Sequence, residues 1–288
     1  MKIINKSNPK VSICIPIYND ENYVSEALES LLNQTYSNIE IIFSNNCSTD
    51  RSIEIIKSYN DSRIKIFNNE ENIGGGKNFE KVFSYATGKY MSYLSSDDIV
   101  ESTAIEKAVA ILEDSKNEDI VLVNSYIGII NNKSKEIFIK RYPFGSGRIS
   151  SYWGIRSNFI YGSNCIGEPN GSVWRSEAFN KIPKPLFQNS VDWTGDLDLK
   201  LELLLMGNAY MIPEPLGKFR VSKDSGSHVN LRYKTASQFR KYAINIYKDK
   251  RYNLSFFWVI VGTFSSFFMM ILRNLFYVFF IKKNEILI

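Results

Sequence analysis

The chain has little cysteine and histidine, and this shortage excludes two kinds of site. Its three cysteines, Cys14, Cys47 and Cys165, lie far apart along the 288 residues. Widely spaced cysteines form no zinc motif, and an odd number of them argues against a disulfide framework. The single histidine, His228, follows Ser225-Gly226-Ser227, where we expect a solvated loop. The chain also begins without a lysine-rich segment leading into an apolar run, so no secretory signal is visible and we expect a reducing, cytosolic setting.

A large excess of charge of one sign is also missing, since the formal net charge is only +5. The basic residues that do cluster come late and directly precede a long apolar segment. They are Arg232, Lys234, Arg240, Lys241, Lys248, Lys250 and Arg251. In that position a basic cluster favours an anionic membrane surface over nucleic acid as the partner. We therefore expect no nucleic acid among the partners.

Apolar runs alternate with helical patterns through the first half of the chain. The runs predict strands at 11–17, 39–43, 63–67, 90–94 and 120–123,. Apolar residues at helical spacing predict helices near 24–32, 53–56, 79–83 and 104–112,. This alternation indicates βαβ units, so we expect an α/β fold with a mainly parallel central sheet flanked by helices. Beyond residue 133 the pattern weakens, and it predicts a Leu-rich helix over 197–205 and late strands at 210–212 and 216–221.

The glycine fingerprints of two common nucleotide-binding folds are absent. A dinucleotide-binding fold carries its glycines directly after the first strand, but this strand runs into Pro16-Ile17-Tyr18-Asn19-Asp20. The glycine-rich stretch 73–78 follows the third strand instead and lacks the Gly-Lys-Ser/Thr ending of a P-loop,. A dehydrogenase and a P-loop NTPase are therefore both poor fits. A flexible loop that caps a helix is the simpler interpretation of 73–78.

Two adjacent carboxylates, Asp97 and Asp98, follow the strand predicted at 90–94. In open α/β sheets, ligands bind at the carboxyl ends of the strands. Carboxylate oxygens in that place suit Mg²⁺ or Mn²⁺ held against a phosphate. The alternative is a solvated turn, because aspartate is a common turn residue.

Several stretches of the first 105 residues occur together in one family. They are 11–19, 30–36, Asn45-Asn46-Cys47-Ser48-Thr49-Asp50, 72–78, 86–90 and Ser95-Ser96-Asp97-Asp98. On these stretches the chain resembles family 2 glycosyltransferases, which have the GT-A fold. That family usually has Asp-Asp-Gly-Ser-Thr-Asp at 45–50 and an Asp-X-Asp metal motif at 95–97. The second half is similar more loosely, at 166–172, 196–199, 205–207 and 213–216.

The resemblance implies a site for a nucleotide-diphosphate sugar donor. Asp97 matches the last position of the metal motif and is the implied ligand of Mg²⁺ or Mn²⁺, with Asp98 beside it. The first position of the motif is Ser95 here, which departs from the family. The implied nucleotide-binding residues are Pro16, Tyr18, Asn45, Lys77 and Asp97.

The base-binding side departs from the family most. Asn45 replaces an aspartate that contacts the nucleotide base in family members, and Lys77 stands where an arginine is frequent. An amide both donates and accepts hydrogen bonds, whereas a carboxylate only accepts. We therefore expect that a donor base other than uracil can fit. Tyr18 either packs against the base or is a core tyrosine.

The resemblance also implies a carboxylate base for the proton of the acceptor hydroxyl. The family's base lies at the N-terminal end of a helix that runs on to a Leu-rich turn and a glycine. That register implies Asp196 as a catalytic residue, with Asp198 second, and Gly195 stands where the family often has glutamate. The alternative is that Asp196 only complements the helix dipole. Glu202 is expected on an exposed face of this helix.

The 19 residues 254–272 carry no charge, and Arg273 separates them from the apolar run 275–281. A stretch of about 18 or more apolar residues is long enough to span a bilayer, and a buried core helix is the alternative. The preceding basic residues place the catalytic part on the cytosolic side. Lys282 and Lys283 after the segment favour a re-entrant or in-plane arrangement over a single span.

A line of small and polar residues runs along this tail when it is drawn as a helix. Its members are Ser255, Gly262, Ser266 and Arg273,. Such a line is either a helix-packing seam or the polar edge of a helix lying in the membrane interface.

These features predict a GT-A glycosyltransferase domain over 1–230, a basic helical connector over 231–253 and a membrane-associated segment over 254–288. By the resemblance, we expect an inverting, metal-dependent hexosyltransferase at the inner (cytoplasmic) membrane, with its catalytic domain facing the cytosol. Its expected acceptor is a lipid-linked glycan in cell-surface polysaccharide synthesis. One alternative is a nucleotide-sugar-binding protein of the same fold without catalysis, favoured by Ser95, Gly195 and Asn45. Another is a soluble polymer-modifying enzyme whose tail is a partner helix.

Overall fold

The computed structural model describes residues 8–143, 145–190, 194–221 and 235–276. The chain forms two compact units. The first comprises the residues up to Asp119 together with Pro169–Lys181, and the second comprises Ile120–Glu168 together with the residues from Ile182 onward. The predictions for His228, Arg232 and Lys234, and for the tail beyond residue 276, fall outside the described residues.

The first unit is built on a sheet of mainly parallel strands. Its strands are β1 Val11–Ile17, β2 Ile39–Asn45, β3 Ile64–Asn68, β4 Tyr90–Tyr93, β5 Ile99–Val100 and β9 Val173–Arg175. Strands β3, β2, β1 and β4 follow one another in parallel, and β9 adds to β4 in the antiparallel direction. The four parallel strands confirm the apolar runs, and β2 is buried along its whole length, as expected for a covered parallel sheet,. The sequence did not predict β9.

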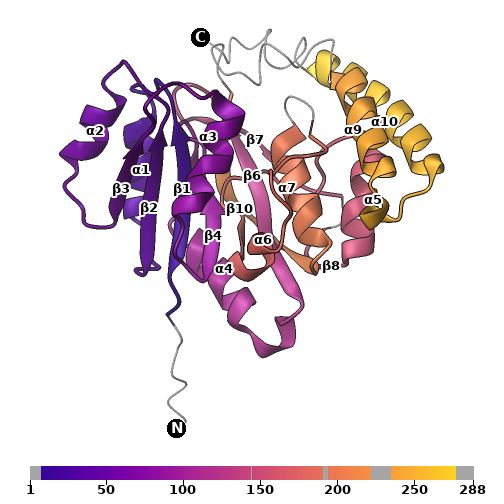
Figure 1. Ribbon diagram of the computed structural model, residues 1–288, viewed down its shortest axis with the longest axis horizontal. Coiled ribbons are helices and arrows are strands. Elements are labelled where there is room, and N and C mark those ends of the chain that lie inside the picture. Colours follow the sequence, from indigo (N-terminus) through magenta and orange to yellow (C-terminus); the bar gives the residue numbers. More distant parts are fainter. Residues whose placement is uncertain (1–7, 144, 191–193, 222–234, 277–288) are drawn as a thin grey trace. The chain divides into compact units, whose positions relative to one another are not determined.

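Helices follow the strands of the first unit in the predicted alternation. They are α1 Val24–Leu32, α2 Ser52–Ser58, α3 Gly75–Val82, α4 Ala104–Glu113 and α6 Ser176–Asn180, with 3-10 turns η1 Phe83–Tyr85 and η2 Ser115–Asn117. Helix α3 packs over β1 and β2 (Figure 1). The buried residues of α4 repeat at helical spacing, so its apolar face packs into the core,. All four helices predicted in this half are present.

An aromatic cluster explains why Pro169–Lys181 belongs to the first unit although it comes late in the chain. The ring of Phe83 lies 5.8 Å from that of Trp174 on β9 and 5.1 Å from that of Phe179 on α6. All three side chains are at most 3% exposed. Burying large aromatic rings stabilises a core strongly, so this cluster holds β9 and α6 against the first unit.

The second unit has its own strands and helices. The strands are β6 Ile120–Ile130, β7 Glu136–Lys140, β8 Gly147–Ile149 and β10 Asn208–Arg220. The helices are α5 Ser151–Tyr161, α7 Gly195–Leu204, α9 Thr235–Lys248 and α10 Phe256–Phe276, and a 3-10 turn η4 covers Lys250–Tyr252. Strands β6 and β10 are parallel, whereas β7 pairs with β6 and β8 with β10 in the antiparallel direction. Strand pairing in both units is therefore mixed rather than purely parallel.

Strand β10 corrects the prediction of two late strands. A single strand runs from Asn208 to Arg220, and its register against β6 shifts between Ile212 and Pro215 and again between Pro215 and Gly217. Proline has no N–H to donate and is confined to edges or irregularities of a sheet. The interval between the two predicted strands, which contains Pro213 and Pro215, is therefore an irregularity inside one strand.

The last helix, α10, packs on α9 and α5 within the second unit (Figure 1). A Cβ atom added at Gly262 would lie 3.1 Å from the ring of Phe239 and 3.2 Å from that of Phe159, and Ser266 is only 4% exposed. The packing-seam interpretation is thus confirmed for Gly262 and Ser266. Within the described part of the chain, no helix combines the length and the apolar character needed to cross a membrane. The predicted membrane-associated segment is therefore not supported by a spanning helix in that part of the chain.

Candidate active site

Three parallel strands of the first unit end at one edge of the sheet, and each is followed by polar side chains. The strand register pairs Ile17 with Asn45 across β1 and β2, and Cys14 with Tyr93 across β1 and β4. Tyr18 follows β1, Asn45 ends β2, and the segment 95–98 follows β4. In α/β sheets this carboxyl edge is where ligands bind. The predicted donor-site residues Pro16, Tyr18, Asn45, Asp97 and Asp98 therefore share one edge.

Asn45 is buried and already hydrogen-bonded at both ends of its amide. Its Nδ2 donates to Oδ1 of Asn68 at 2.9 Å, and its Oδ1 accepts from the backbone N of Ser48 at 2.9 Å. The side chain thus ties the end of β2 to β3 and to the following turn. Only 7% of Asn45 is exposed. A nucleotide base could therefore contact Asn45 only at the exposed part of its side chain or after these two hydrogen bonds rearrange.

Further asparagines extend this network, and the sequence reasoning did not assign them. Asn46 donates from Nδ2 to Oδ1 of Asn72 at 2.7 Å, and its own Oδ1 accepts from Nδ2 of Asn69 at 3.1 Å and from the backbone N of Ile73 at 2.9 Å. Asn78 accepts from Asn69 at 2.9 Å and donates to the Ser44 carbonyl at 2.8 Å. The network fixes the glycine-containing loop to the end of β2. The recurrence of asparagine after successive strands was the available signal.

Tyr18 and Lys77 are the accessible members of the predicted donor site. Tyr18 is 48% exposed, so the alternative of a core tyrosine is wrong. Lys77 is exposed in the first turn of α3, whose N-cap Gly74 has a φ of 82°. That left-handed conformation strongly favours glycine. Added Cβ atoms at Gly74, Gly75 and Gly76 would meet nothing within 4 Å, so the loop leaves open space beside Lys77.

The two adjacent aspartates occupy different environments. Asp98 is 1% exposed and accepts from Nδ2 of Asn170 at 2.5 Å, whereas Asp97 is partly exposed. Asp98 therefore anchors the turn after β4 to the returning segment that contains Asn170. Asp20 joins the same region by accepting a hydrogen bond from the Ser96 hydroxyl, and burial raises the pKa of Asp20. The sequence reasoning missed both Asp20 and Asn170.

Asp97 fits a divalent ion as a single accessible carboxylate. Among the described residues, no group of three or more histidine, cysteine, aspartate or glutamate side chains could hold a metal by itself. Mg²⁺ characteristically binds through one or two carboxylates plus substrate phosphates and water. The Asp97 carboxylate, with the Ser95 hydroxyl two residues away, therefore suits a metal ion that binds together with a diphosphate.

In the second unit, Asp196 lies in the first turn of α7 and keeps part of its surface exposed, although protein atoms surround most of it. Nδ2 of Asn164 donates to its Oδ2 at 3.1 Å. Burial, followed by the negative charge of Glu168, raises the pKa of Asp196 to about 6. A carboxylate with this pKa is ionised at neutral pH and is a stronger proton acceptor than an ordinary aspartate.

Charged residues beside Asp196 form a cluster that sequence reasoning missed. Lys200 is 2% exposed, lies one helical turn after Asp196 on α7, and donates from Nζ to the Gly167 carbonyl. Burial lowers the pKa of Lys200 to about 8. Lys140 forms an ion pair with the neighbouring Glu168. The positive charges of Lys200 and Lys140 oppose the rise in the pKa of Asp196. A lysine inside the apolar run of α7 was the available signal.

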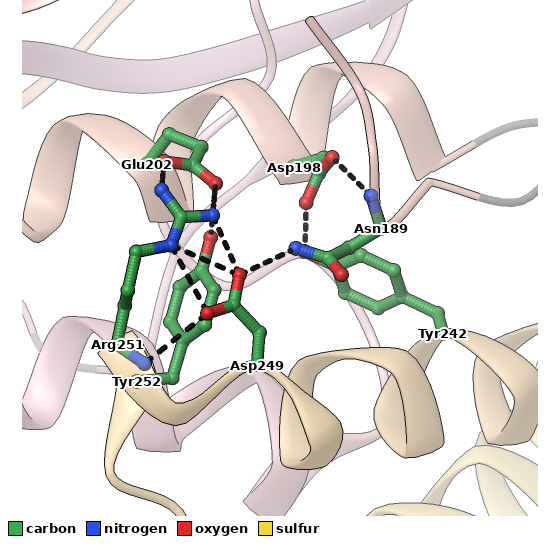
Figure 2. A network of polar contacts seen from close by, with 7 residues as sticks. All are labelled: Asn189, Asp198, Glu202, Tyr242, Asp249, Arg251 and Tyr252. Atoms are coloured by element: carbon green, nitrogen blue, oxygen red, sulfur yellow. Dashed lines mark hydrogen bonds and ion pairs between the residues drawn. The ribbon is translucent and has the colours of Figure 1, made fainter. Parts of the chain in front are cut away.

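Asp198 lies in a different environment from Asp196, among the polar contacts drawn in Figure 2. It is fully buried, and it accepts from the backbone N of Asn189 at 3.2 Å and from the hydroxyl of Tyr242 on α9 at 3.4 Å. Burial raises its pKa to about 7. These contacts tie α7 to α9, which is a structural role, and they favour Asp196 over Asp198 as the accessible carboxylate.

Glu202, expected on an exposed face, is instead 5% exposed. It accepts two hydrogen bonds from the Arg251 guanidinium, at 2.9 and 2.7 Å, and one from the Tyr252 hydroxyl at 3.0 Å (Figure 2). Bidentate arginine–carboxylate pairs of this kind are strong and directional. The prediction failed because its partners lie 49 and 50 residues away in the sequence.

Two comparisons with known sequences bear on this arrangement. Residues 12–180 match the model of a family described as Glycosyl transferase family 2. An uncharacterized glycosyltransferase of Haemophilus influenzae is 30% identical over 251 residues, which make up 84% of this chain and 75% of that protein.

Solved structures share the fold at low sequence identity. S. aureus TarS 1–349, in complex with UDP-GlcNAc, superposes with a TM-score of 0.63 at 21% identity, over 83% of this chain and 66% of that chain. The mannosyltransferase PcManGT of Pyrobaculum calidifontis, in complex with GDP-Man and Mn²⁺, superposes with a TM-score of 0.59 at 13% identity, over 91% of this chain and 74% of that chain. At these identities the likeness concerns the fold alone.

Proposed function

The chain belongs to glycosyl transferase family 2 and has the GT-A fold, and we propose that this transferase moves a hexose from a nucleotide-diphosphate sugar to a hydroxyl of a lipid-linked glycan. The observation that carries the proposal is Asp196, a partly exposed carboxylate at the start of α7 with a pKa raised to about 6. General bases work best when their pKa lies near the operating pH. Asp196 is therefore the proposed base.

The donor is proposed to bind at the carboxyl ends of β1, β2 and β4. Tyr18 offers an exposed ring on which a nucleotide base can stack, and Lys77 offers a cation beside the open glycine loop. The solved neighbours hold UDP-GlcNAc in TarS and GDP-Man in PcManGT, so this fold accommodates both uridine and guanosine donors. Asn45 stands where the family usually has a carboxylate, and guanosine donors therefore deserve the same test as uridine donors.

Mg²⁺ or Mn²⁺ is the proposed cofactor, and Asp97 would hold it. A bound divalent ion offsets the negative charge that develops on the leaving nucleoside diphosphate. Asp97 suits this role because Asp98 is committed to Asn170 and is buried. The structure of PcManGT is a complex with both GDP-Man and Mn²⁺.

The transfer itself is proposed to invert the anomeric centre. Asp196 takes the proton of the acceptor hydroxyl while the acceptor oxygen bonds to the anomeric carbon, and the bond to the diphosphate breaks on the opposite face. Asn164 holds one carboxylate oxygen of Asp196, which orients the base. Lys200 and Lys140 favour the ionised form that accepts the proton.

The acceptor class and the location are part of the same proposal. A lipid-linked glycan of cell-surface polysaccharide synthesis requires an enzyme that works at the cytosolic face of the cytoplasmic membrane. The exposed basic residues Lys248 and Lys250 and the exposed apolar residues of α10 support this location.

The proposal is tested by donor binding followed by turnover. Thermal unfolding is measured with UDP-sugars and GDP-sugars, each with and without Mn²⁺, and nucleoside diphosphate release is then measured with a lipid-linked glycan acceptor. We expect one donor to raise the melting temperature in a Mn²⁺-dependent way and to release diphosphate only with acceptor. A donor that binds without ever releasing diphosphate favours the non-catalytic alternative suggested by Ser95 and Gly195, and stabilisation by no donor contradicts the proposal.

A further inference from the structure

One face of α10 exposes a continuous set of large apolar side chains. They are Phe256, Phe257, Ile260, Phe264, Phe267, Phe268, Ile271, Leu272 and Leu275, each between 41% and 73% exposed. They recur every three or four residues, so they lie along one side of the helix over roughly 30 Å at 1.5 Å per residue,. Exposed apolar patches of this extent mark a surface that another phase or partner covers.

The opposite side of α10 is committed to the second unit. Val259 is 5% exposed, and Gly262 and Ser266 face α9 and α5. At Gly162, where α5 ends, an added Cβ atom would lie 2.1 Å from the backbone N of Ser266. A helix with one side packed this closely cannot be surrounded by lipid, which leaves only its exposed side available.

A tyrosine ring and a lysine lie beside the first turn of α10. Residues 235–252, which precede it, carry five basic side chains and one acidic side chain. The ring of Tyr247 lies 5.5 Å from that of Phe256, and Nζ of Lys250 lies 5.3 Å from the centre of the Tyr247 ring. The basic end of α9 therefore lies beside the apolar face. Lysine near an apolar helix face is the arrangement that attracts anionic lipids.

Aromatic side chains of α5 also lie near the first turns of α10. The guanidinium of Arg156 lies 3.6 Å from the centre of the Tyr152 ring and 5.9 Å from that of Trp258, and its Nη2 donates to the Asn253 carbonyl at 3.1 Å. Tyr152 is 54% exposed and its neighbour Trp153 is 50% exposed. Tyrosine and tryptophan concentrate at membrane–water interfaces because their rings have an apolar body and a polar edge.

From this geometry we infer that α10 lies in the plane of an anionic bilayer, with its phenylalanine face in the lipid and its opposite face on α9 and α5. A second copy of the chain is the weaker occupant, because helix pairs in water set their register with charged residues beside the seam and residues 254–272 carry none. The inference deepens the membrane location in the proposed function. It requires neither donor nor acceptor.

The test is flotation of the full chain with vesicles of phosphatidylcholine, alone or mixed with phosphatidylglycerol, without any sugar nucleotide. The variant is Phe264→Ser/Phe267→Ser/Phe268→Ser, and the matched control is Phe138→Ser, at an exposed phenylalanine on β7. Each buried phenylalanine contributes roughly tenfold or more to transfer from water, so the triple variant should bind mixed vesicles at least about 100-fold more weakly. The control should float like the wild type. Unchanged melting temperatures of the variants establish that their folds are intact.

A second variant tests the role of charge. Lys248→Glu/Lys250→Glu should weaken binding to the mixed vesicles and leave binding to phosphatidylcholine unchanged. The inference is overturned if the wild type binds neither vesicle, if the triple variant floats as well as the wild type, or if the wild type is a dimer in solution that the triple change makes monomeric. A chain that floats but never transfers sugar leaves this inference standing and contradicts the proposed function.

Discussion

The two units hold their polar side chains by different chemistry. At the ligand edge of the first unit, neutral amides bond to one another, as Asn46 does with Asn69 and Asn72. In the second unit, buried charged groups meet charged partners, as the buried Glu202 meets the partly exposed Arg251. The first arrangement fixes a loop without introducing charge, whereas the second brings ionisable groups into a low dielectric.

Because of this difference, pH is expected to change the protonation of polar groups differently in the two units. An amide keeps the same donors and acceptors at every physiological pH. The carboxyl groups of Asp196 and Asp198 instead have raised pKa values, about 6 and about 7, and they change their protonation near neutrality. The amide network of the donor side should thus be insensitive to pH near neutrality, and the acceptor side should be sensitive.

The largest effect is expected at Asp97, a partly exposed carboxylate of the donor side. Asp97→Ala should reduce the Mn²⁺-dependent transfer rate by about a thousandfold, because metal ions contribute several kcal/mol to a transition state of this kind. Donor binding should also lose its Mn²⁺ dependence, measured by calorimetry. Asp61→Ala is the control, since Asp61 is also partly exposed in the first unit and pairs with Arg63 instead. Unchanged Mn²⁺ dependence in Asp97→Ala would remove Asp97 from the site.

The next effect is expected on the acceptor side. Asp196→Asn keeps the shape of the side chain and removes the proton acceptor, so kcat should fall at least about 10²-fold while donor affinity stays unchanged. In the wild type, kcat should fall about tenfold for each pH unit below about 6, because the protonated carboxylate accepts no proton,.

Asp198→Asn is the comparison variant for this prediction, and it should retain transfer as long as it remains folded. If Asp198→Asn abolishes transfer and Asp196→Asn does not, the catalytic base is Asp198, two residues after the proposed one. If neither change matters, the acceptor side lies elsewhere and the contrast between the units fails.

The first unit could be predicted from the sequence because its signals are local. The strands β1 and β2 are continuous apolar runs, and the buried positions of α1 and α4 recur at helical spacing. Parallel strands place their carboxyl ends at one edge, so the sequence order alone brought Asn45 and Asp97 to the same place. Strand β9 escaped prediction because a short strand from a distant segment joins the sheet through tertiary packing.

The second unit could be predicted only in part because its contacts are long-range. The helix around Asp196 was predicted, but no local pattern shows that Asp198 meets Tyr242, 44 residues away. The uncharged tail predicted an apolar helix correctly, and its packing on α9 and α5 was not visible in its sequence. Charged residues inside an apolar helical run, such as Lys200 and Glu202, are the local sign that partners exist elsewhere.

A smaller effect compares one ion pair from each unit. Glu202 and Arg251 in the second unit have side chains 6% and 36% exposed, whereas Glu177 and Lys181 in the first unit have side chains 80% and 60% exposed. Arg251→Ala leaves a buried carboxylate without its cation and should destabilise the chain by about 2 kcal/mol, below the range for fully buried pairs because Arg251 is partly solvated. Lys181→Ala should change the free energy of unfolding by less than about 0.5 kcal/mol. Equal losses in urea denaturation would break the comparison between the units.

The last expected effect is a gain in stability when the proposed base is removed. The Asp196 carboxyl has an ordinary pKa of 3.8 and a pKa of about 6 in the fold. Between these values the folded chain binds more protons than the unfolded chain, so its stability falls as the pH rises, and above about pH 6 the ionised carboxylate destabilises the fold by a constant amount,. The raised pKa already includes the favourable charge of Lys200, so a neutral amide should be better tolerated than the carboxylate. Asp196→Asn should therefore unfold with a free energy about 1–3 kcal/mol higher at pH 7 and should match the wild type below about pH 4. Urea denaturation at the two pH values measures both quantities, and a variant that is less stable at pH 7 would mean that Lys200 depends on Asp196 as the partner of a net stabilising ion pair.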